Sequence, residues 1–272
     1  MLARKVLRLL GIMVTLALLD ACVRGAGEAT PHYIRVAGST SMMPALNELA
    51  SAYSALHPDV LVHVQGGNTA AGLRALLNGQ VDLAAASWKM ELEGEGAARL
   101  SWHPVARDGL GLIVHPHNTL RDISLIKASE LFAGWLTSWT EAGGRGGEVQ
   151  VLSREEGSGS RAAFEAVVMA GRRVTQTALV MPSSQAVVQW VASHPDAIGY
   201  VSMAHLTTTV RIVSLGGVSP TIQNVENGSY PLSRVLYLVT REPASRSVQE
   251  FIQFCLSPAG QAIIRQYHGK AN

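Results

Sequence analysis

The chain has 272 residues, of which 47% are hydrophobic, 15% are charged and 6% are aromatic. This composition excludes a disordered chain, and the length is sufficient for two modest lobes that each have a hydrophobic core. With 22 Lys and Arg against 20 Asp and Glu, the formal net charge is +2, so no strong global field favours nucleic acid as a partner. Without Met1–Ala21 the chain loses three positive charges and one negative charge, and its net charge becomes zero.

The N-terminal residues have the features of a secretion signal. A basic start is followed by the apolar run Leu9–Leu19, which is too short to span roughly 30 Å of hydrocarbon as a helix, for which about 20 residues are needed. The run ends at Leu19-Asp20-Ala21-Cys22, which resembles a bacterial lipobox in which the cysteine is lipidated and becomes the mature N-terminus. We therefore expect residues 1–21 to be a lipoprotein signal peptide and residues 22–31 to be a linker.

The two cysteines, Cys22 and Cys255, are too few for a disulfide-dense scaffold or a four-cysteine zinc site. If Cys22 carries the lipid, Cys255 is a lone thiol in the apolar segment Phe251–Leu256, where it acts as a small buried hydrophobe. A disulfide between the two cysteines is the alternative. No later stretch is apolar enough to span a membrane, so only the lipid anchor would contact one.

Short β-branched runs alternate with helical periodicity along the mature chain, which is typical of an α/β fold with a mostly parallel sheet. The pattern predicts strands at Tyr33–Ala37, Leu61–Val64, Val81–Ala86, Leu110–Val114, Val149–Leu152 and Val235–Thr240. It predicts helices at Met43–Leu56, Leu73–Leu77, Ile126–Leu136, Ser160–Met169, Ser183–His194, Ser247–Leu256 and Pro258–Tyr267.

The last strand and helices have no strand partner nearby in the sequence, so we expect the C-terminal segment to return and complete the first lobe. The prediction is an α/β protein with two mixed sheets flanked by helices. Lobe 1 would contain residues 31–113 and 233–272, and lobe 2 would contain residues 114–232. Two crossovers would join the lobes and leave a cleft between them.

Small hydroxyl residues gather where predicted strands end. Gly38–Ser41, Gly66–Gly72 and Gly157–Ser160 each lead from a strand into a helix, and a fourth loop starts at Ser87. A helix N-terminus attracts anions because its N–H groups are free and its dipole is positive there. In any one loop taken alone, Ser or Thr at a helix start is usually a plain N-cap. Their recurrence at the carboxyl ends of strands, where α/β sheets bind ligands, favours an anion site.

The third loop adds charge to this pattern. Arg154 can offer a forked guanidinium to an oxyanion, and Glu156, two residues later, could hold that guanidinium in place. The alternative is a surface charge cluster in which Arg154 and Arg161 are simply solvated.

Ordered motifs extend from the first loop to the C-terminal region. They are Ala37–Ser41, Gly66–Gly67, Val81–Leu83, Ala86–Ser87, Arg107–Leu110, Glu130–Gly134, Trp139, Arg154–Glu165 and Phe254–Gln261. With these motifs the chain resembles the phosphate-binding periplasmic receptors of ABC importers. The resemblance implies a type II periplasmic-binding-protein fold that binds inorganic phosphate in the periplasm or cell envelope and delivers it to an inner-membrane ABC permease. We also expect a monomer without a cofactor.

Carried over by position, the resemblance implies that eight residues bind the ligand: Thr40, Ser41, Thr69, Ser87, Arg154, Ser158, Gly159 and Ser160. Arg154 would be the one charged donor, braced by Glu156. Some family members have an Asp near the position of Ser87 that accepts a proton from the anion, and Asp108 is the nearest candidate for that role here. Because a serine accepts a proton less strongly than a carboxylate, another oxyanion or a small acidic metabolite stays open as the ligand.

Other function classes have less support in the sequence. It contains no Gly-x-Ser-x-Gly elbow, no His-Glu-x-x-His motif and no Gly-x-x-x-x-Gly-Lys loop, so we do not expect an enzyme. His115 and His117 flank Pro116 without clustered carboxylates, and we interpret them as surface residues rather than metal ligands. An adhesion or sensor lipoprotein that has kept the fold without transport is a further alternative.

Overall fold

The computed structural model describes residues 31–91 and 97–271. The predicted signal peptide, Cys22 and all but the last residue of the predicted linker lie outside the described residues. Residues from Tyr33 onward belong to one folded unit. None of the helices within the described ranges combines the length and the hydropathy that a membrane crossing requires.

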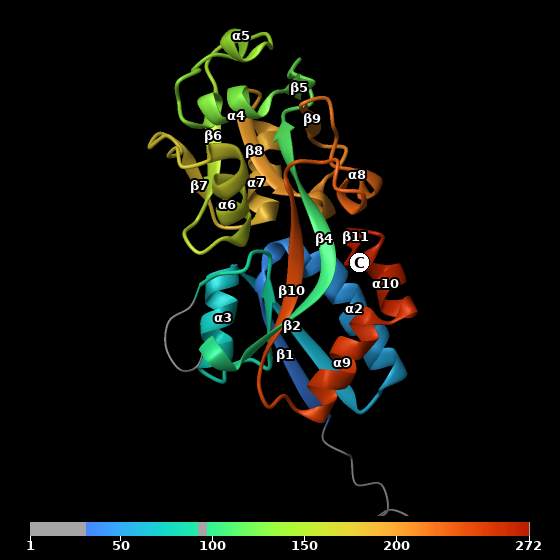
Figure 1. Ribbon diagram of the computed structural model, residues 1–272. Helices are drawn as coiled ribbons and strands as arrows, with labels where there is room; N and C mark the ends of the chain where they lie inside the picture. The colour runs from blue at the N-terminus through green and yellow to red at the C-terminus, as the bar shows by residue number, and fades with distance from the viewer. Residues whose placement is uncertain (1–30, 92–96, 272) are drawn as a thin grey trace, which may run out of the picture. The chain divides into compact units, whose positions relative to one another are not determined.

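Strands and helices alternate along the chain (Figure 1). The strands are β1 His32–Ser39, β2 Val60–Gly67, β3 Leu83–Ala86, β4 Leu100–Val114, β5 Asp122–Ile123, β6 Gln150–Arg154, β7 Leu179–Met181, β8 Ala197–Ser202, β9 Arg211–Leu215, β10 Ser233–Arg241 and β11 Gly269–Lys270. The α-helices are α2 Met43–Leu56, α3 Thr69–Leu77, α4 Leu125–Phe132, α5 Trp139–Ala142, α6 Gly159–Phe164, α7 Ser184–Ser193, α8 Ile222–Glu226, α9 Arg246–Leu256 and α10 Pro258–Ile264. Single turns of 3₁₀-helix are η1 Thr40–Met42, η2 Ala97–Arg99 and η4 Met203–His205, and η3 Glu165–Met169 is a π-helix.

The strands of the described residues follow the order β2-β1-β3-β10-β4-β8-β6-β7. Strand β1 is parallel to β3, and β6 is parallel to both β7 and β8. At the centre, however, β10 is antiparallel to β3 and β4, and β4 is antiparallel to β8 and β9. The predicted α/β class with mixed strands is confirmed, but the expectation of a mostly parallel sheet is wrong at the centre. The reason is that β4 and β10 carry the chain between two halves of the fold in opposite directions (Figure 1).

Strand β4 is much longer than the predicted strand Leu110–Val114, since it begins at Leu100. Its first part pairs with β10, and its last residues pair with β8 and β9. The sequence conceals the first part because Pro104 interrupts it, and proline is depleted inside strands. The register between β10 and β4 shifts between Leu236 and Tyr237, opposite that proline, so a bulge accommodates it.

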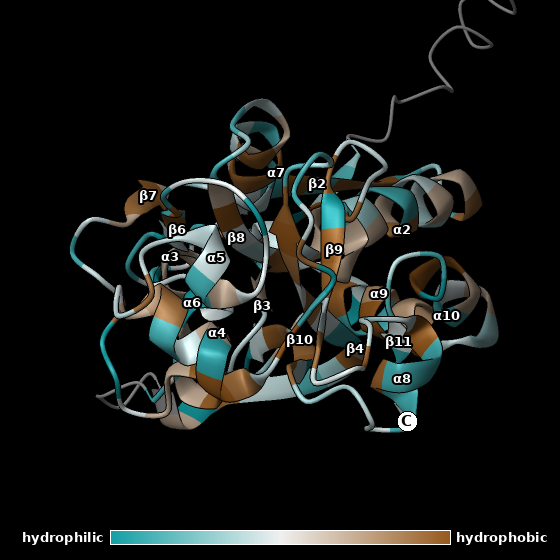
Figure 2. Cartoon of the chain, turned by 90° about the horizontal axis from the view of Figure 1, so that it is seen from above, coloured by the Kyte–Doolittle hydropathy of each residue, from teal (hydrophilic) through white to brown (hydrophobic). Residues whose placement is uncertain are grey.

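Hydrophobic side chains form separate cores in the two halves. In the half that we call lobe 1, built on β1–β3, α2, α3, α9 and α10, Leu46, Tyr53 and Phe251 are buried together. In lobe 2, built on β6–β9 and α4–α7, Phe132 packs against Phe164 with a ring separation of 4.5 Å. Strands β8 and β10 are largely hydrophobic, whereas α4 and α8 carry both polar and apolar segments (Figure 2). Each half thus buries the apolar face of its helices on its own strands.

Cys255 lies in the lobe 1 core, where it is fully buried. Its thiol is free, and Cys22, the other partner of the alternative disulfide, lies outside the described residues. Burial raises the pKa of this thiol, which keeps it protonated and unreactive. The interpretation of Cys255 as a small buried hydrophobe is confirmed.

Three predicted helices end earlier than expected or change type. The helix predicted to reach Leu136 stops at Phe132, because Gly134 adopts the left-handed conformation at φ 76°. The helix predicted over Ser160–Met169 is split into α6 and the π-helix η3, and the last helix ends at Ile264.

Candidate functional site

The four hydroxyl-bearing loops of the sequence follow the carboxyl ends of strands. Strand β1 ends at Ser39, β3 leads directly to Ser87, and β6 ends at Arg154. The helices α3 and α6 begin after Asn68 and Ser158, whose side-chain oxygens accept backbone N–H groups of the first turn. Asn and Ser are favoured N-caps because they replace the hydrogen bonds that a first turn lacks. These capping residues therefore start α3 and α6 shortly after the preceding strand ends.

In lobe 1, Ser87 Oγ lies within hydrogen-bond distance of two other hydroxyls, those of Ser39 and Thr69. Ser39 Oγ donates to Ser87 Oγ at 2.8 Å, and the backbone N–H of Ser87 donates to Thr69 Oγ1 at 3.1 Å. Gly159, the first residue of α6 in lobe 2, faces this group. A Cβ atom at Gly159 would lie 2.5 Å from both Ser87 Oγ and Thr69 Oγ1. Only glycine therefore lets the start of α6 approach the lobe 1 hydroxyls so closely.

Two further hydroxyl pairs connect the lobes. Ser41 Oγ lies 3.0 Å from Ser160 Oγ, and Thr40 Oγ1 lies 3.3 Å from Ser184 Oγ. The backbone N–H of Ser184 also donates to Thr40 Oγ1 at 3.3 Å. Ser41, Ser160 and Ser184 are fully or almost fully buried. Residues more than 100 positions apart in the sequence therefore place their hydroxyls at one point between the lobes.

Arg154 is buried at this point, with a relative exposure of 2%. Its Nε and Nη2 donate to the two carboxylate oxygens of Glu155 at 2.8 and 2.9 Å, which is a bidentate pair. Its Nε also donates to the carbonyl oxygen of Met181 at 3.1 Å, and its Nη1 donates to Ser184 Oγ at 3.3 Å. The alternative in which Arg154 is a solvated surface residue is wrong.

The predicted brace of Arg154 is also wrong: the partner is Glu155, not Glu156. Residues two apart share a face only in an extended strand, and β6 ends at Arg154. The chain then turns through Gly157 at φ 81°. Because the backbone is no longer extended after Arg154, Glu156 is not held on the same face as Arg154. The carbonyl oxygen of Glu156 instead accepts a hydrogen bond from Asn68 Nδ2 at 3.5 Å.

A second buried arginine, Arg234, was missed by the sequence analysis. Its Nη1 donates to Ser160 Oγ at 3.0 Å, and its Nη2 donates to Ser41 Oγ at 2.8 Å. Its Nε and Nη2 also donate to Asp108 Oδ2 at 3.0 and 2.7 Å. The prediction that Arg154 is the one charged group of the site is therefore incomplete.

The sequence does hold a signal for Arg234. The side chains of Leu232, Leu236 and Leu238 are buried, and Arg234 occupies the same alternating positions. A charged residue on the buried face of a strand needs a partner. The register pairs Arg234 with Asp108, and only the fold reveals that pairing.

Asp108 is fully buried and braces Arg234 rather than facing a ligand with a free oxygen. Its Oδ1 accepts hydrogen bonds from Ser202 Oγ at 2.7 Å, the backbone N–H of Met203 at 3.2 Å and His268 Nδ1 at 3.2 Å. Burial alone raises the pKa of Asp108, but Arg234, His268 and Ser202 together lower it to about 2. The predicted role of Asp108 as the acceptor of a ligand proton is replaced by a structural one, because both its oxygens already accept hydrogen bonds.

The remaining predicted residue, Ser158, is buried but uses its hydroxyl as the N-cap of α6. The plain N-cap explanation therefore describes this side chain, and its neighbours Gly159 and Ser160 are the residues that meet lobe 1. Among the described residues, no three His, Cys, Asp or Glu side chains gather in a group that could hold a metal ion. The rings of His115 and His117 lie 4.8 Å apart.

Comparison with known proteins shows the family of the chain. The model of the PBP superfamily domain matches residues 25–259. The phosphate-binding protein PstS of Bacillus subtilis is 30% identical over 232 residues, which cover 85% of this chain and 77% of that protein. The chain belongs to the PstS family of the PBP superfamily.

The fold of this PstS-family chain is similar to those of solved structures. A candidate phosphate ABC transporter substrate-binding protein from Clostridium perfringens, solved with bound phosphate, is 31% identical with a TM-score of 0.84. The match covers 89% of this chain and all of that one. An ABC-type phosphate transport receptor from Vibrio cholerae is 28% identical with a TM-score of 0.70, and the match covers 86% of this chain and 98% of that one. The predicted family and the type II fold are confirmed.

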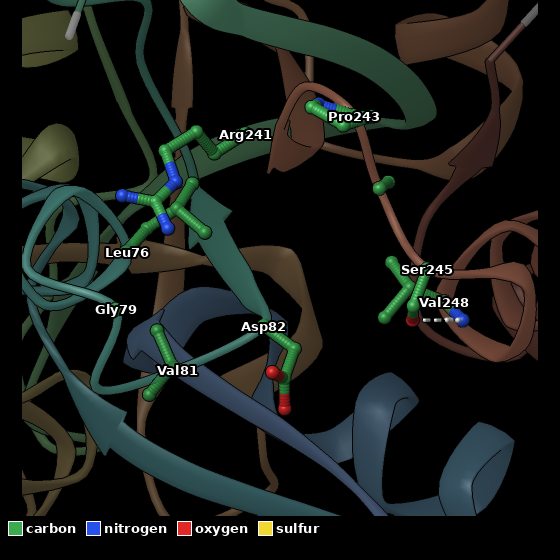
Figure 3. Close-up of a pocket in the computed structure, with 9 residues that line it drawn as sticks. Leu76, Gly79, Val81, Asp82, Arg241, Pro243, Ser245 and Val248 are labelled. Atoms are coloured by element: carbon green, nitrogen blue, oxygen red, sulfur yellow. Dashed lines mark hydrogen bonds between the residues drawn. The ribbon is translucent and has the colours of Figure 1, made fainter.

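A separate pocket of about 160 Å³ lies on lobe 1 of this PstS-family chain, between α3, the end of β10 and the start of α9 (Figure 3). Arg241 lines it and donates through Nη1 to the carbonyl oxygen of Leu77 at 3.2 Å. Asp82 lines it too and forms an ion pair of 3.0 Å with Arg35. None of the eight predicted ligand-binding residues lines this pocket.

Proposed function

We propose that this chain is an extracytoplasmic receptor that binds inorganic phosphate between its two lobes for ABC-type import. The observation that carries the proposal is the meeting of buried hydroxyls from both lobes, Ser41 with Ser160 and Thr40 with Ser184. The buried Arg154 guanidinium donates to Ser184 Oγ of the second pair. The relatives named as phosphate-binding proteins, and the Clostridium perfringens protein with bound phosphate, support the choice of anion.

The proposed ligand-binding residues are the eight of the sequence analysis: Thr40, Ser41, Thr69, Ser87, Arg154, Ser158, Gly159 and Ser160. Ser158 and Gly159 would act through their backbone N–H groups, since the hydroxyl of Ser158 caps α6. An anion that enters the site would replace the direct contact between Ser41 and Ser160, so both hydroxyls would donate to it.

Hydrogen bonds supply the affinity in this proposal, since both arginines of the site already have a carboxylate partner. Each neutral hydrogen bond contributes about 0.5–1.5 kcal/mol net, and each charge-assisted one about 1.5–3 kcal/mol. After ordering and desolvation costs are subtracted, about eight donors are sufficient for a dissociation constant near 1 μM, which corresponds to about −8 kcal/mol.

Titration calorimetry with phosphate, arsenate, sulfate, molybdate and tungstate tests the proposal. We expect phosphate to bind at least as tightly as any other anion of the panel. Tighter binding of another anion would reassign the ligand within the same fold, and heat from none of them would favour the adhesion or sensor alternative. Incubation with a chromogenic phosphoester checks the expectation that the receptor is not an enzyme, because colour release would contradict it.

The rest of the proposal concerns the place and organisation of the receptor. Residues 31–113 with 233–272 would form one moving lobe and residues 114–232 the other, and their closure on phosphate would give a monomeric receptor a state that the inner-membrane permease recognises. A lipid on Cys22 would hold the mature chain at the cell envelope. Mass spectrometry of the envelope fraction tests the anchor, since a Cys22→Ala variant would lose the diacylglyceryl mass.

A further inference from the structure

Arg234 connects one hydroxyl of each lobe. Its Nη2 donates to Ser41 Oγ at 2.8 Å and its Nη1 donates to Ser160 Oγ at 3.0 Å, while the two hydroxyl oxygens lie 3.0 Å apart. The three groups form a closed triangle, and the side chain of Arg234 is 1% exposed. Ser41 and Ser160 are 119 residues apart in the sequence and belong to different lobes. One guanidinium therefore holds both hydroxyls at once.

Asp108 prevents this guanidinium from turning. Its Oδ2 accepts from both Nε and Nη2 of Arg234, and the two residues are paired across β4 and β10, the strands that run between the lobes. Its Oδ1 is in turn fixed by Ser202 Oγ and His268 Nδ1. The direction of the guanidinium N–H groups is thus set by the strands that connect the lobes, independently of any ligand.

The N–H groups of Arg234 decide which way the two hydroxyls face. A serine oxygen that accepts from a guanidinium has its own O–H hydrogen left to donate elsewhere. Arginine carries only donors and is always protonated, so this polarity cannot reverse. Both serines are thereby prepared as donors, which is the role that an oxyanion between the lobes requires.

We propose that Arg234 is a positioning residue of the anion site, which turns the hydroxyls of Ser41 and Ser160 into donors and joins them only when the lobes are closed. The proposal rests on the proposed function and deepens it, since it concerns the same site. Arg234 acts through the two serines and its own charge stays paired with Asp108. An ammonium group at this position would keep the pair with Asp108 but would lack the planar fork that serves two hydroxyls.

The test is a mutant cycle measured by phosphate titration calorimetry. In the unmodified background, we expect Arg234→Lys to weaken phosphate binding about tenfold or more. In a Ser41→Ala/Ser160→Ala background, we expect the same change to weaken binding by less than about threefold, because the groups through which Arg234 acts are gone. An equal loss in both backgrounds, or no loss in the unmodified one, would overturn the proposal.

Two comparisons separate positioning from mere support of the fold. Arg241→Lys, on the same strand but exposed and outside the site, serves as the matched control and should leave phosphate binding unchanged. An Arg234→Met/Asp108→Asn variant removes both charges of the pair, and we expect it to melt close to the unmodified protein yet to bind phosphate as weakly as Arg234→Lys. Recovery of tight binding in that variant would contradict a positioning role.

X-ray scattering adds a readout that affinity alone does not supply. Phosphate should reduce the radius of gyration of the unmodified protein, and this reduction should be smaller at saturating phosphate in Arg234→Lys. An identical reduction in the two proteins would contradict the joining of the lobes by Arg234. If the unmodified protein binds no phosphate, the proposed function fails and takes this inference with it, whereas unmodified binding that Arg234→Lys leaves intact overturns the inference alone.

Discussion

The two buried arginines of the site are held in opposite ways. Arg154 pairs with the next residue in the chain, Glu155, whose side chain is 23% exposed. Arg234 pairs with Asp108, which is 126 residues away in the sequence and fully buried. Arg154 ends a parallel strand at a loop, whereas Arg234 lies on an antiparallel strand that connects the lobes.

This difference separates what each arginine contributes. The carboxylate of a partly exposed pair is in contact with water, so removal of that carboxylate lowers the stability of the protein only slightly. A pair without access to water leaves an uncompensated charge when one partner is removed. We therefore expect changes at the Arg154 pair to reduce affinity with little loss of stability, and the loss of one partner of the Arg234 pair to reduce both.

The largest expected effect is on stability at the buried pair. Asp108→Ala leaves the Arg234 guanidinium and His268 without their acceptor, and we expect the free energy of unfolding to fall by about 3–5 kcal/mol. Glu155→Ala should lower it by less, because water can replace the partly exposed carboxylate and the Arg154 guanidinium keeps its hydrogen bonds to Met181 and Ser184. Urea denaturation of both variants measures the contrast, and equal losses would break the distinction between the two pairs.

Arg154→Ala should act on binding instead. It removes the charge-assisted donor of lobe 2, which contributes about 1.5–3 kcal/mol, so phosphate affinity should fall by about tenfold or more. The melting temperature should change less than that of Asp108→Ala. Calorimetry together with a thermal melt checks both statements, and an unchanged affinity would count against Arg154 as a ligand-binding residue.

Gly159→Ala tests how closely the lobes must approach. The added Cβ would lie 2.5 Å from Ser87 Oγ and Thr69 Oγ1, and such overpacking costs about 1–3 kcal/mol. Alanine is preferred to glycine in a helix, so the substitution should not weaken α6 itself. A loss of phosphate affinity would therefore come from the contact between the added Cβ and lobe 1. Gly147→Ala is the matched control, since nothing lies within 4 Å of its added Cβ, and it should bind phosphate normally.

Ser87→Asp should sharpen the choice of anion. A carboxylate at this position would accept the proton of hydrogen phosphate but would repel fully ionised sulfate. We expect the ratio of phosphate affinity to sulfate affinity to rise by about tenfold, because the added carboxylate and the sulfate ion carry like charges. Competition calorimetry measures this ratio, and a ratio equal to that of the unmodified protein would refute the argument from protonation.

The smallest expected effect comes from His205 of lobe 2. Its Nε2 donates to the carbonyl oxygen of Thr40 in lobe 1 at 2.8 Å. Burial lowers the pKa of His205 from its ordinary 6.5, although Thr40 and Asp108 oppose the shift. As the pH falls, His205 is protonated in the unfolded chain before it is protonated in the folded protein. The stability that neutral His205 contributes is therefore complete above pH 6.5 and is lost as the pH falls toward the folded pKa.

A His205→Gln variant checks this sign. Glutamine keeps an N–H donor for the carbonyl oxygen of Thr40 but does not titrate, so its urea midpoint should fall less between pH 7 and pH 5 than that of the unmodified protein. His63→Gln, at an exposed position, is the control and should follow the unmodified protein. Parallel pH profiles in the three proteins would exclude the proposed role of His205.

Much of the architecture and of the local site was predictable from the sequence. Strand ends, helix caps and Gly-rich turns depend on residues within about five positions of each other, so Arg154, Ser158 and the loops that carry Ser41 and Ser87 could be located by pattern alone. The helical spacing of Met43, Leu46, Leu49, Tyr53 and Leu56 falls on α2, Met43–Leu56. Short-range geometry of this kind is encoded in the spacing of side chains along the chain.

Only the tertiary structure decided the long-range partners. It extended β4 back to Leu100 and joined Arg234 to Asp108 across β10 and β4. The physical reason is that a strand pairs with whatever strand lies beside it, and strand register is set by packing and turn geometry rather than by propensity. A charged residue that looks like a solvated strand end in the sequence is therefore recognised as part of the site only when its antiparallel neighbour is known.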